Sequence, residues 1–265
     1  MIKFFRRIRQ KLLSEGKTGQ YLKYAIGEII LVVIGILIAL GINNWNESRK
    51  NQNLEYNYIQ ELKTDLVKDS SIINAMLGQS NRQLRAKYLL HKYLIENTDF
   101  VLLDNNLDQY PDFLKTHEYH RDSLSSYFMI QWTSKSRYPF NPITTTIDEM
   151  KSTGRIGIIR NQAIRRSIIE TYNNYETYKL TYHNNYQLQM DELLKLIFDE
   201  IPELYTMDNS DIVKIFREQR VRNRFEGNFV ISQNRLLRQL KKDNQNLLIE
   251  LDGFTEKEKR KHYNM

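Results

Sequence analysis

Two histidines form the pattern in this chain that comes closest to metal chemistry. They begin and end the run HEYH at residues 117–120, so they stand three positions apart. The helix of a zinc protease carries its histidines four positions apart, where both side chains reach one ion. Asp122 and His183 could complete a ligand set, but such a cluster is more often a hydrated or hydrogen-bonded surface. We therefore expect no metal, no cofactor and no catalytic residue.

Tyrosines recur at helical spacing later in the chain, among several asparagines. The four that could face a ligand or partner on one surface are Tyr172, Tyr175, Tyr182 and Tyr186. The alternative is that these rings pack in the core of a helical bundle with their hydroxyls at its edge, which is the commoner place for tyrosine at this spacing.

The net charge of the chain is concentrated at its N-terminus. The formal charge is +7, from 39 Lys and Arg against 32 Asp and Glu. Residues 1–23 hold seven cations and one anion, which leaves a charge of +1 for the remaining 242 residues. A basic face for nucleic acid is therefore not expected. The absence of cysteine also excludes disulfides, thiolate catalysis and Cys-ligated metal sites.

The elements that position these residues are predicted to be helices. Only 10 glycines and 4 prolines occur in 265 residues, too few for the many turns of a β-rich fold. Apolar residues recur at steps of four or seven from Leu54 onward, which predicts a long amphipathic helix. Asn141-Pro142 is a typical helix start and Gly154 a typical stop, and the next helix is expected to open at Asn161.

One apolar run predicts a membrane span. Residues 29–42 read IILVVIGILIALGI, and residues 24–42 together would cover about 28 Å as a helix, close to the thickness of a bilayer core. The insertion energy of these side chains outweighs the cost of Glu28 near one edge. Two alternatives are a buried helix of a soluble protein and a cleaved signal peptide, for which Ala39 and Gly41 have suitable spacing.

The residues that flank the span predict its direction. Cations precede it at Lys3, Arg6, Arg7, Arg9, Lys11, Lys17 and Lys23. Because positive flanks stay in the cytoplasm, the N-terminus is expected inside and the rest exported. The aromatic residues placed to anchor the chain at the membrane interfaces are Phe4, Phe5, Tyr21, Tyr24 and Trp45, the first two on an amphipathic helix.

Within the span, one face carries Glu28, Gly35 and Ala39. The two small residues would let a second helix approach closely, and a carboxyl group inside a membrane turns toward a partner. In the alternative interpretation, Glu28 reaches out to the lipid headgroups. Two interpretations therefore remain: the helix associates with a second copy of itself, or it contacts only the lipid bilayer.

Two stretches of the sequence resemble a known family. The segment from Phe4 to Glu47 and the block from Pro142 to Tyr175 are similar to the two characteristic regions of an uncharacterised family, domain of unknown function 6090. The resemblance implies a single-span envelope protein of Bacteroidota, and it brings no activity, cofactor or catalytic residue. Gly41 stands where the family would have a larger polar residue, which concerns only local helix packing.

These observations combine into one expectation of fold and function. The fold class is all-α, with an N-terminal transmembrane helix that continues into an exported antiparallel helical bundle. The predicted divisions are a basic tail at 1–23, a span at 24–42, an extracytoplasmic domain at 43–252 and a charged tail at 253–265. The expected function is non-enzymatic binding of a protein partner or scaffolding in the cell envelope. The alternatives are a ligand-sensing module that acts through a separate transducer and a hydrolase built on the histidine cluster.

Overall fold

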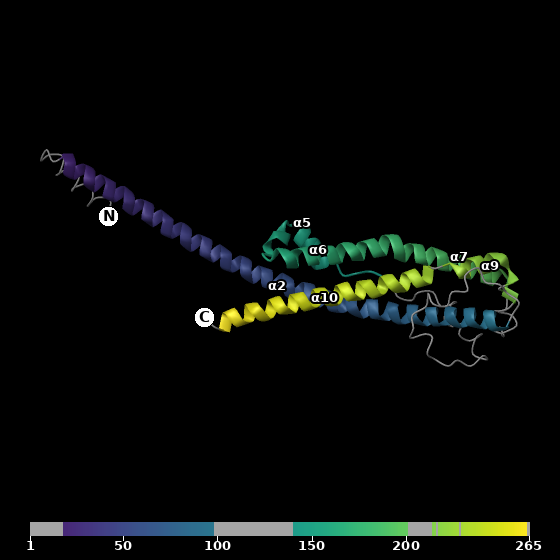
Figure 1. The fold of residues 1–265 in the computed structure, drawn as a ribbon. Helices are drawn as coiled ribbons and strands as arrows, with labels where there is room; N and C mark the ends of the chain where they lie inside the picture. Colours follow the sequence, from purple (N-terminus) through teal and green to yellow (C-terminus); the bar gives the residue numbers. More distant parts are fainter. Residues whose placement is uncertain (1–17, 98–139, 201–213, 216, 228, 264–265) are drawn as a thin grey trace. The chain divides into compact units, whose positions relative to one another are not determined.

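The computed structural model describes residues 18–97, 140–200, 214–215, 217–227 and 229–263. Contacts between residues divide the chain into two compact units, 1–57 and 58–265, and each is described by itself. Within the described ranges every regular element is a helix (Figure 1). The prediction of an all-α fold is confirmed for this part of the chain.

The described part of the first unit is the N-terminal part of helix α2, which runs without interruption over Thr18–Asn97. The first proline of the chain is Pro111, so nothing in α2 removes a backbone donor. An 18-residue window near its start has a mean hydropathy of 2.8, and none of this window is buried. The helix is therefore long and apolar enough to cross a membrane, as the sequence predicts.

The second unit is built on three long helical segments. The first is the remainder of α2, from Tyr58 onward. The second is a rod of α6 (Gln162–Thr177), the π-helix η4 (Tyr178–His183) and α7 (Asn184–Glu200). The third is α10 (Phe229–Tyr263), which continues past Asp252, where the sequence suggests a charged tail. Short helices α5 (Thr145–Ser152), η3 (Arg155–Ile158) and α9 (Gln219–Glu226) connect them.

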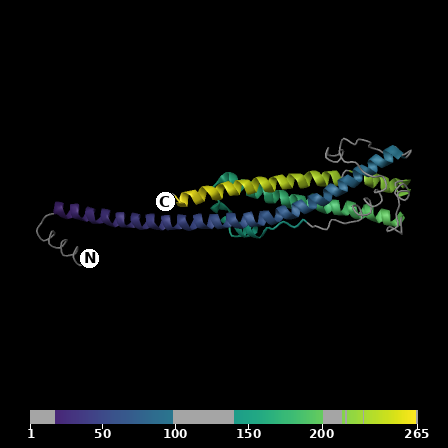
Figure 2. The same cartoon turned by 90° about the horizontal axis from the view of Figure 1, so that it is seen from below.

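Side-chain contacts fix the directions of these segments. Along α10, Asn234 contacts Ser80 of α2 and Asn244 contacts the carbonyl of Leu66, so α10 runs antiparallel to α2. On the rod, Tyr186 contacts Gln83, and Asn244 also contacts Tyr175, which places residue 175 beside residue 66. The rod and α2 are therefore parallel to each other, and α10 is antiparallel to both (Figures 1 and 2).

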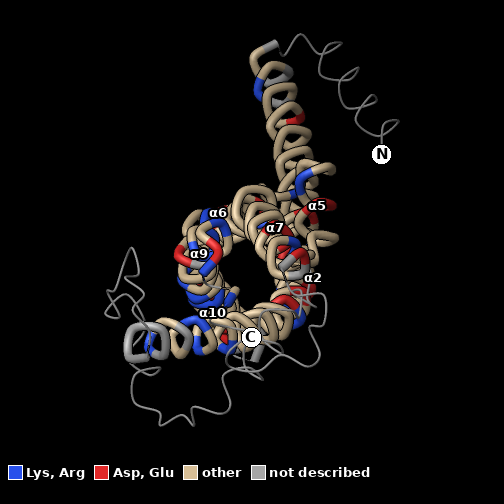
Figure 3. Tube along the Cα trace, turned by 90° about the vertical axis from the view of Figure 1, so that its right-hand side faces the viewer, with Lys and Arg blue, Asp and Glu red and all other residues tan. Residues whose placement is uncertain are grey.

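The core of the second unit follows the apolar spacing of the sequence. Its most deeply buried large side chains include Ile59, Leu62, Leu66, Ile73, Phe140, Tyr175 and Lys87. Phe140 packs edge-on against the rings of Tyr175 and Tyr178, at centroid distances of 5.5 and 5.1 Å. Residues of both charge signs are interspersed on the surrounding helices (Figure 3). The core itself also holds polar groups, as the buried Lys87 shows, whose ammonium donates to the carbonyl of Gly227 at 2.7 Å.

The helix that was expected to start at Asn141-Pro142 begins three residues later. α5 has Thr144 as its N-cap and Thr145 as its first residue. The backbone N–H of Ile143 donates to Asp69 at 2.9 Å, and the Thr146 hydroxyl donates to Asp65 at 2.6 Å. The bond of Ile143 holds the segment before α5 against α2 and so displaces the helix start, and the bond of Thr146 holds the first turn of α5 against the same helix.

The other two boundary predictions in this region are confirmed. Gly154 follows the end of α5 with a φ of 68°, the left-handed conformation that favours glycine. Asn161 is the N-cap of α6, and its side-chain oxygen accepts from the N–H groups of Ala163 and Ile164 at 3.0 and 3.3 Å.

Candidate functional site

Three of the four tyrosines predicted as a possible surface lie in the core. Tyr172, Tyr175 and Tyr186 are each at most 4% exposed, so they offer no surface, and the bundle-core alternative describes them correctly. The Asn244 amide donates to the Tyr175 hydroxyl at 2.6 Å, and the Tyr186 hydroxyl donates to Gln83. Burial raises the pKa of all three phenols, which keeps them neutral.

Tyr182 is the exception, and the π-helix η4 explains why. Consecutive buried positions on α6 and α7 are never more than four residues apart, but Tyr178 and His183, both buried with no buried residue between them, are five apart. A π-helical turn adds one residue to the helix and rotates its neighbours. Tyr182 is therefore turned out of the core and is 42% exposed.

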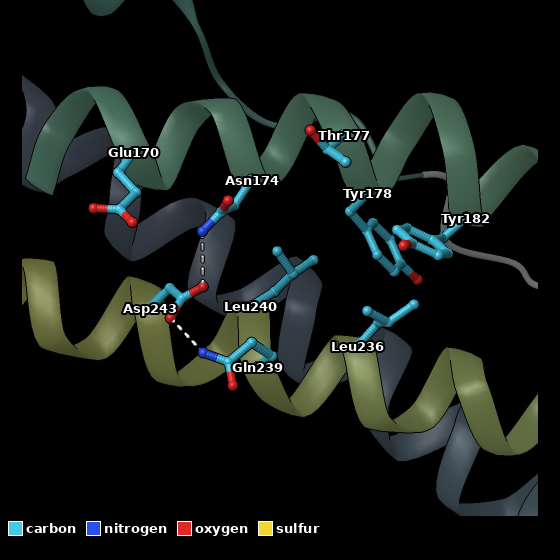
Figure 4. Close-up of a pocket in the computed structure, with 9 residues that line it drawn as sticks. All are labelled: Glu170, Asn174, Thr177, Tyr178, Tyr182, Leu236, Gln239, Leu240 and Asp243. Atoms are coloured by element: carbon cyan, nitrogen blue, oxygen red, sulfur yellow. Dashed lines mark hydrogen bonds between the residues drawn. The ribbon is translucent and has the colours of Figure 1, made fainter.

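A groove lies where Tyr182 emerges, between α6–η4 and α10. It encloses about 290 Å³. One wall carries Glu170, Asn174, Thr177, Tyr178 and Tyr182, and the other carries Leu236, Gln239, Leu240 and Asp243 (Figure 4). The two carboxylates lie toward one end, and the tyrosine rings and Leu236 lie toward the other (Figure 4).

The polar end of the groove is ordered by Asp243. Its two carboxylate oxygens accept hydrogen bonds from the amides of Asn174, at 3.2 Å, and of Gln239, at 2.7 Å (Figure 4). Neither donor is a cation, and none of the nine lining residues is a Lys or Arg. The lining therefore combines two negative charges with amides, aromatic rings and leucines.

A second polar cluster, not predicted from the sequence, lies inside the bundle, where Asp65 and Asp69 of α2 accept hydrogen bonds from Thr146 and Ile143. Asp69 is fully buried, and its second carboxylate oxygen has no hydrogen-bond partner among the described residues. Burial raises the pKa of Asp69 to about 6, while the N–H of Ile143 opposes the shift and Asp65 adds to it. The sequence does indicate that Asp69 is buried, because Leu62, Leu66 and Ile73 recur at core spacing and Asp69 falls at a core position of the same repeat.

The metal hypothesis finds no support in the described residues. Residues 117–122 lie outside them. His183 is buried, and its pKa is lowered by burial and by Lys179. Among the residues that the structure describes, no three potential ligands gather around one point.

The residues predicted to contact the membrane are only partly described. Phe4, Phe5 and the cations from Lys3 to Lys17 lie outside the described residues, whereas Tyr21, Lys23 and Tyr24 lie in α2. Trp45 is exposed, and the guanidinium of Arg49 lies 5.9 Å from the centre of its ring. Their role at the membrane stays a prediction.

The predicted helix–helix face is present on α2. Gly35 and Ala39 are both exposed, and a Cβ added at Gly35 would meet no atom within 4 Å. Glu28 lies half-exposed at the start of the same face. This open surface has room for a second helix, and self-association stays a prediction.

A known family matches the residues that build most of this architecture. The family of unknown function DUF6090 matches residues 28–196, well over half of the chain. The chain belongs to the DUF6090 family. The DUF6090 match begins at Glu28. Of the N-terminal segment that suggested the family, only residues 28–47 therefore fall within the match, whereas the later block, 142–175, is fully covered.

The DUF6090 match ends before α9 and α10, so one wall of the groove lies inside the DUF6090 region and the other outside it. Neither a curated protein nor a solved structure matches the chain.

Proposed function

We propose that this DUF6090 protein crosses a bacterial inner membrane once, with its basic tail in the cytoplasm and its helical second unit in the periplasm. The apolar side chains that α2 exposes between Ile29 and Ile42 carry the proposal, because a bilayer would cover them. The seven cations before the apolar run support the direction.

The exported unit would act as a non-enzymatic binding protein, either for one protein partner or as a scaffold of the cell envelope. The α6–α10 groove supports this role because it opens to solvent and combines Tyr182 with amides and carboxylates. Such side chains recognise shape and charge in a partner.

Photo-crosslinking in native membranes tests the binding role. A benzophenone amino acid is placed at Tyr182 in the full chain and, as a matched control, at Leu188, which is exposed on α7 and does not line the groove. The proposal predicts a discrete crosslinked protein from position 182 that is absent from position 188. Identical crosslinks from both positions, or none from position 182, would argue against it.

Ligand sensing is the second candidate, and the volume of the groove favours it. Its volume of about 290 Å³ is close to about 300 Å³, the size at which pockets that hold small molecules begin. In this second proposal the sensor acts through a separate transducer protein. A purified monomer whose melting temperature rises with a small molecule, without any crosslinked partner, would favour sensing over scaffolding.

A further inference from the structure

We propose that the α6–α10 groove binds a primary ammonium group carried on an apolar stem. This inference rests on the groove being a binding site, as proposed above, and it adds the chemical class of the occupant. The ammonium could belong to a free amine or to a lysine side chain of a partner protein, and the two sources present the same chemistry.

The charge of the groove is the first argument. Glu170 and Asp243 contribute two carboxylates to the lining, and no cation lines the groove beside them. The hydrogen bonds of Asp243 come from neutral amides, so they orient the carboxylate without cancelling its charge. An ammonium group supplies the missing positive charge and three N–H donors.

The apolar end of the groove is the second argument. Leu236 and Leu240 line it on α10, and the rings of Tyr178 and Tyr182 cover it from the other wall (Figure 4). Tyr178 and Leu240 are already buried, whereas Tyr182 and Leu236 are partly exposed, so an apolar stem is favoured here because it removes the last two from water. A tyrosine ring also attracts a nearby cation through its π face.

The spacing of the two ends sets the length of the occupant. Asp243 and Leu236 are seven residues apart on α10, which corresponds to about 10 Å along the helix. 4-Phenylbutylamine is of about this length, with the amine at one end and an aromatic ring at the other. We therefore use it as the probe for the free-amine form.

Calorimetric titration of the full chain in nanodiscs tests the inference with three probes of the same shape. They are 4-phenylbutylamine, the neutral 4-phenylbutanol and the anionic 4-phenylbutyrate. Loss of one charge-assisted hydrogen bond changes affinity by about tenfold or more. We expect the amine to bind at least about tenfold more tightly than the alcohol and the acid not to bind. Equal affinity for amine and alcohol, or no amine binding, would overturn the inference.

Paired variants distinguish the effect of the groove carboxylates on amine binding from the effect of the overall charge of the protein. Glu170→Gln with Asp243→Asn removes both groove carboxylates, and Glu176→Gln with Glu250→Gln removes two exposed carboxylates from the same two helices outside the groove. Amine affinity should fall about tenfold in the first pair and stay unchanged in the second. An equal loss in both would overturn the inference. Tyr182→Ala, at a 42% exposed side chain, should also weaken binding and serves if the first pair fails to fold.

Two peptides then distinguish the sources of the amine. One is acetyl-Phe-Lys-amide. The other is the same peptide with the lysine side-chain nitrogen acetylated, which removes the positive charge and serves as the control. Tighter binding of the unmodified peptide than of the free amine indicates a protein lysine, and the reverse order indicates a small amine. If no amine binds although Tyr182 still crosslinks to a partner, this inference fails and the proposed function stands.

Discussion

One carboxylate oxygen of Asp69 accepts a hydrogen bond from the backbone N–H of Ile143 at 2.9 Å and so joins segments 74 residues apart. The other oxygen of Asp69 is buried without a partner among the described residues. This arrangement suits a protonated carboxyl better than an ionised one. The stability of the bundle should therefore depend on pH through this residue.

Replacing Asp69 with Asn should remove that dependence. Burial raises the pKa of Asp69 from 3.8 to about 6, so its contribution to stability is complete below pH 4 and is lost as the pH rises through 6. We expect Asp69→Asn to be more stable than the native chain at pH 8, by about 1–3 kcal/mol, and equal to it at pH 4. Thermal unfolding of the full chain followed by circular dichroism measures this. Glu61→Gln, at an exposed position of α2, is the control, and a loss of stability in Asp69→Asn at pH 8 would contradict the prediction.

Replacing Gly154 with Ala should destabilise the turn between α5 and η3. At a φ of 68° a side chain costs about 1–2 kcal/mol, because its Cβ approaches the following carbonyl. Gly157 has no positive φ and is equally open around its Cα, so Gly157→Ala is the matched control. Chemical unfolding should show the loss for Gly154→Ala alone. Similar losses in both variants would mean that the backbone conformation is not the cause.

Deleting Leu180 should be tolerated better than deleting another exposed leucine. The π-helix η4 holds one residue more than an α-helix would, and Leu180 is exposed within it. Its removal restores a four-residue step between Tyr178 and His183 and keeps α7 in register. Deleting Leu188 would instead rotate the following core residues by about 100°. We expect a loss of about 1 kcal/mol or less for the first deletion and several for the second, measured by thermal unfolding. Equal losses of stability would show that η4 does not contain an extra residue relative to an α-helix.

Replacing Gly35 with Ile should weaken self-association of the membrane helix. A branched side chain at Gly35 separates the backbones of two helices that pack through the face of Gly35 and Ala39. Gly41→Ile introduces the same side chain on a different face of α2, where the surface is also open. A membrane two-hybrid signal should fall for Gly35→Ile and persist for Gly41→Ile. An unchanged signal in both would favour an isolated helix with Glu28 at the headgroups.

Local signals were sufficient to predict much of the fold. The apolar spacing and the lack of proline predicted the continuous helix α2. The N-cap at Asn161 and the helix stop at Gly154 could be predicted because each is determined by residues close to it in the sequence. The start of α5 was misplaced because Asp69 and Asp65, more than 70 residues away, decide how the segment around Ile143 lies.

The candidate site was harder to foresee for a related reason. Tyr182 shares its spacing with the core tyrosines, and only the π-helix turns it outward. Leu236 and Leu240 follow a core-like repeat in α10, although both also line the groove. The groove results from packing α10 against α6, which no single segment of sequence encodes.

Labelling of single cysteines shows on which side of the membrane each end of the proposed anchor lies. The chain has no cysteine, so Ser14→Cys and Asn185→Cys each create a unique site, the second at an exposed position of α7. A membrane-impermeant maleimide is applied to intact spheroplasts and to lysed ones. We expect Asn185→Cys to be labelled in both preparations and Ser14→Cys only after lysis. Labelling of Ser14→Cys in intact spheroplasts, or protection of Asn185→Cys, would contradict it.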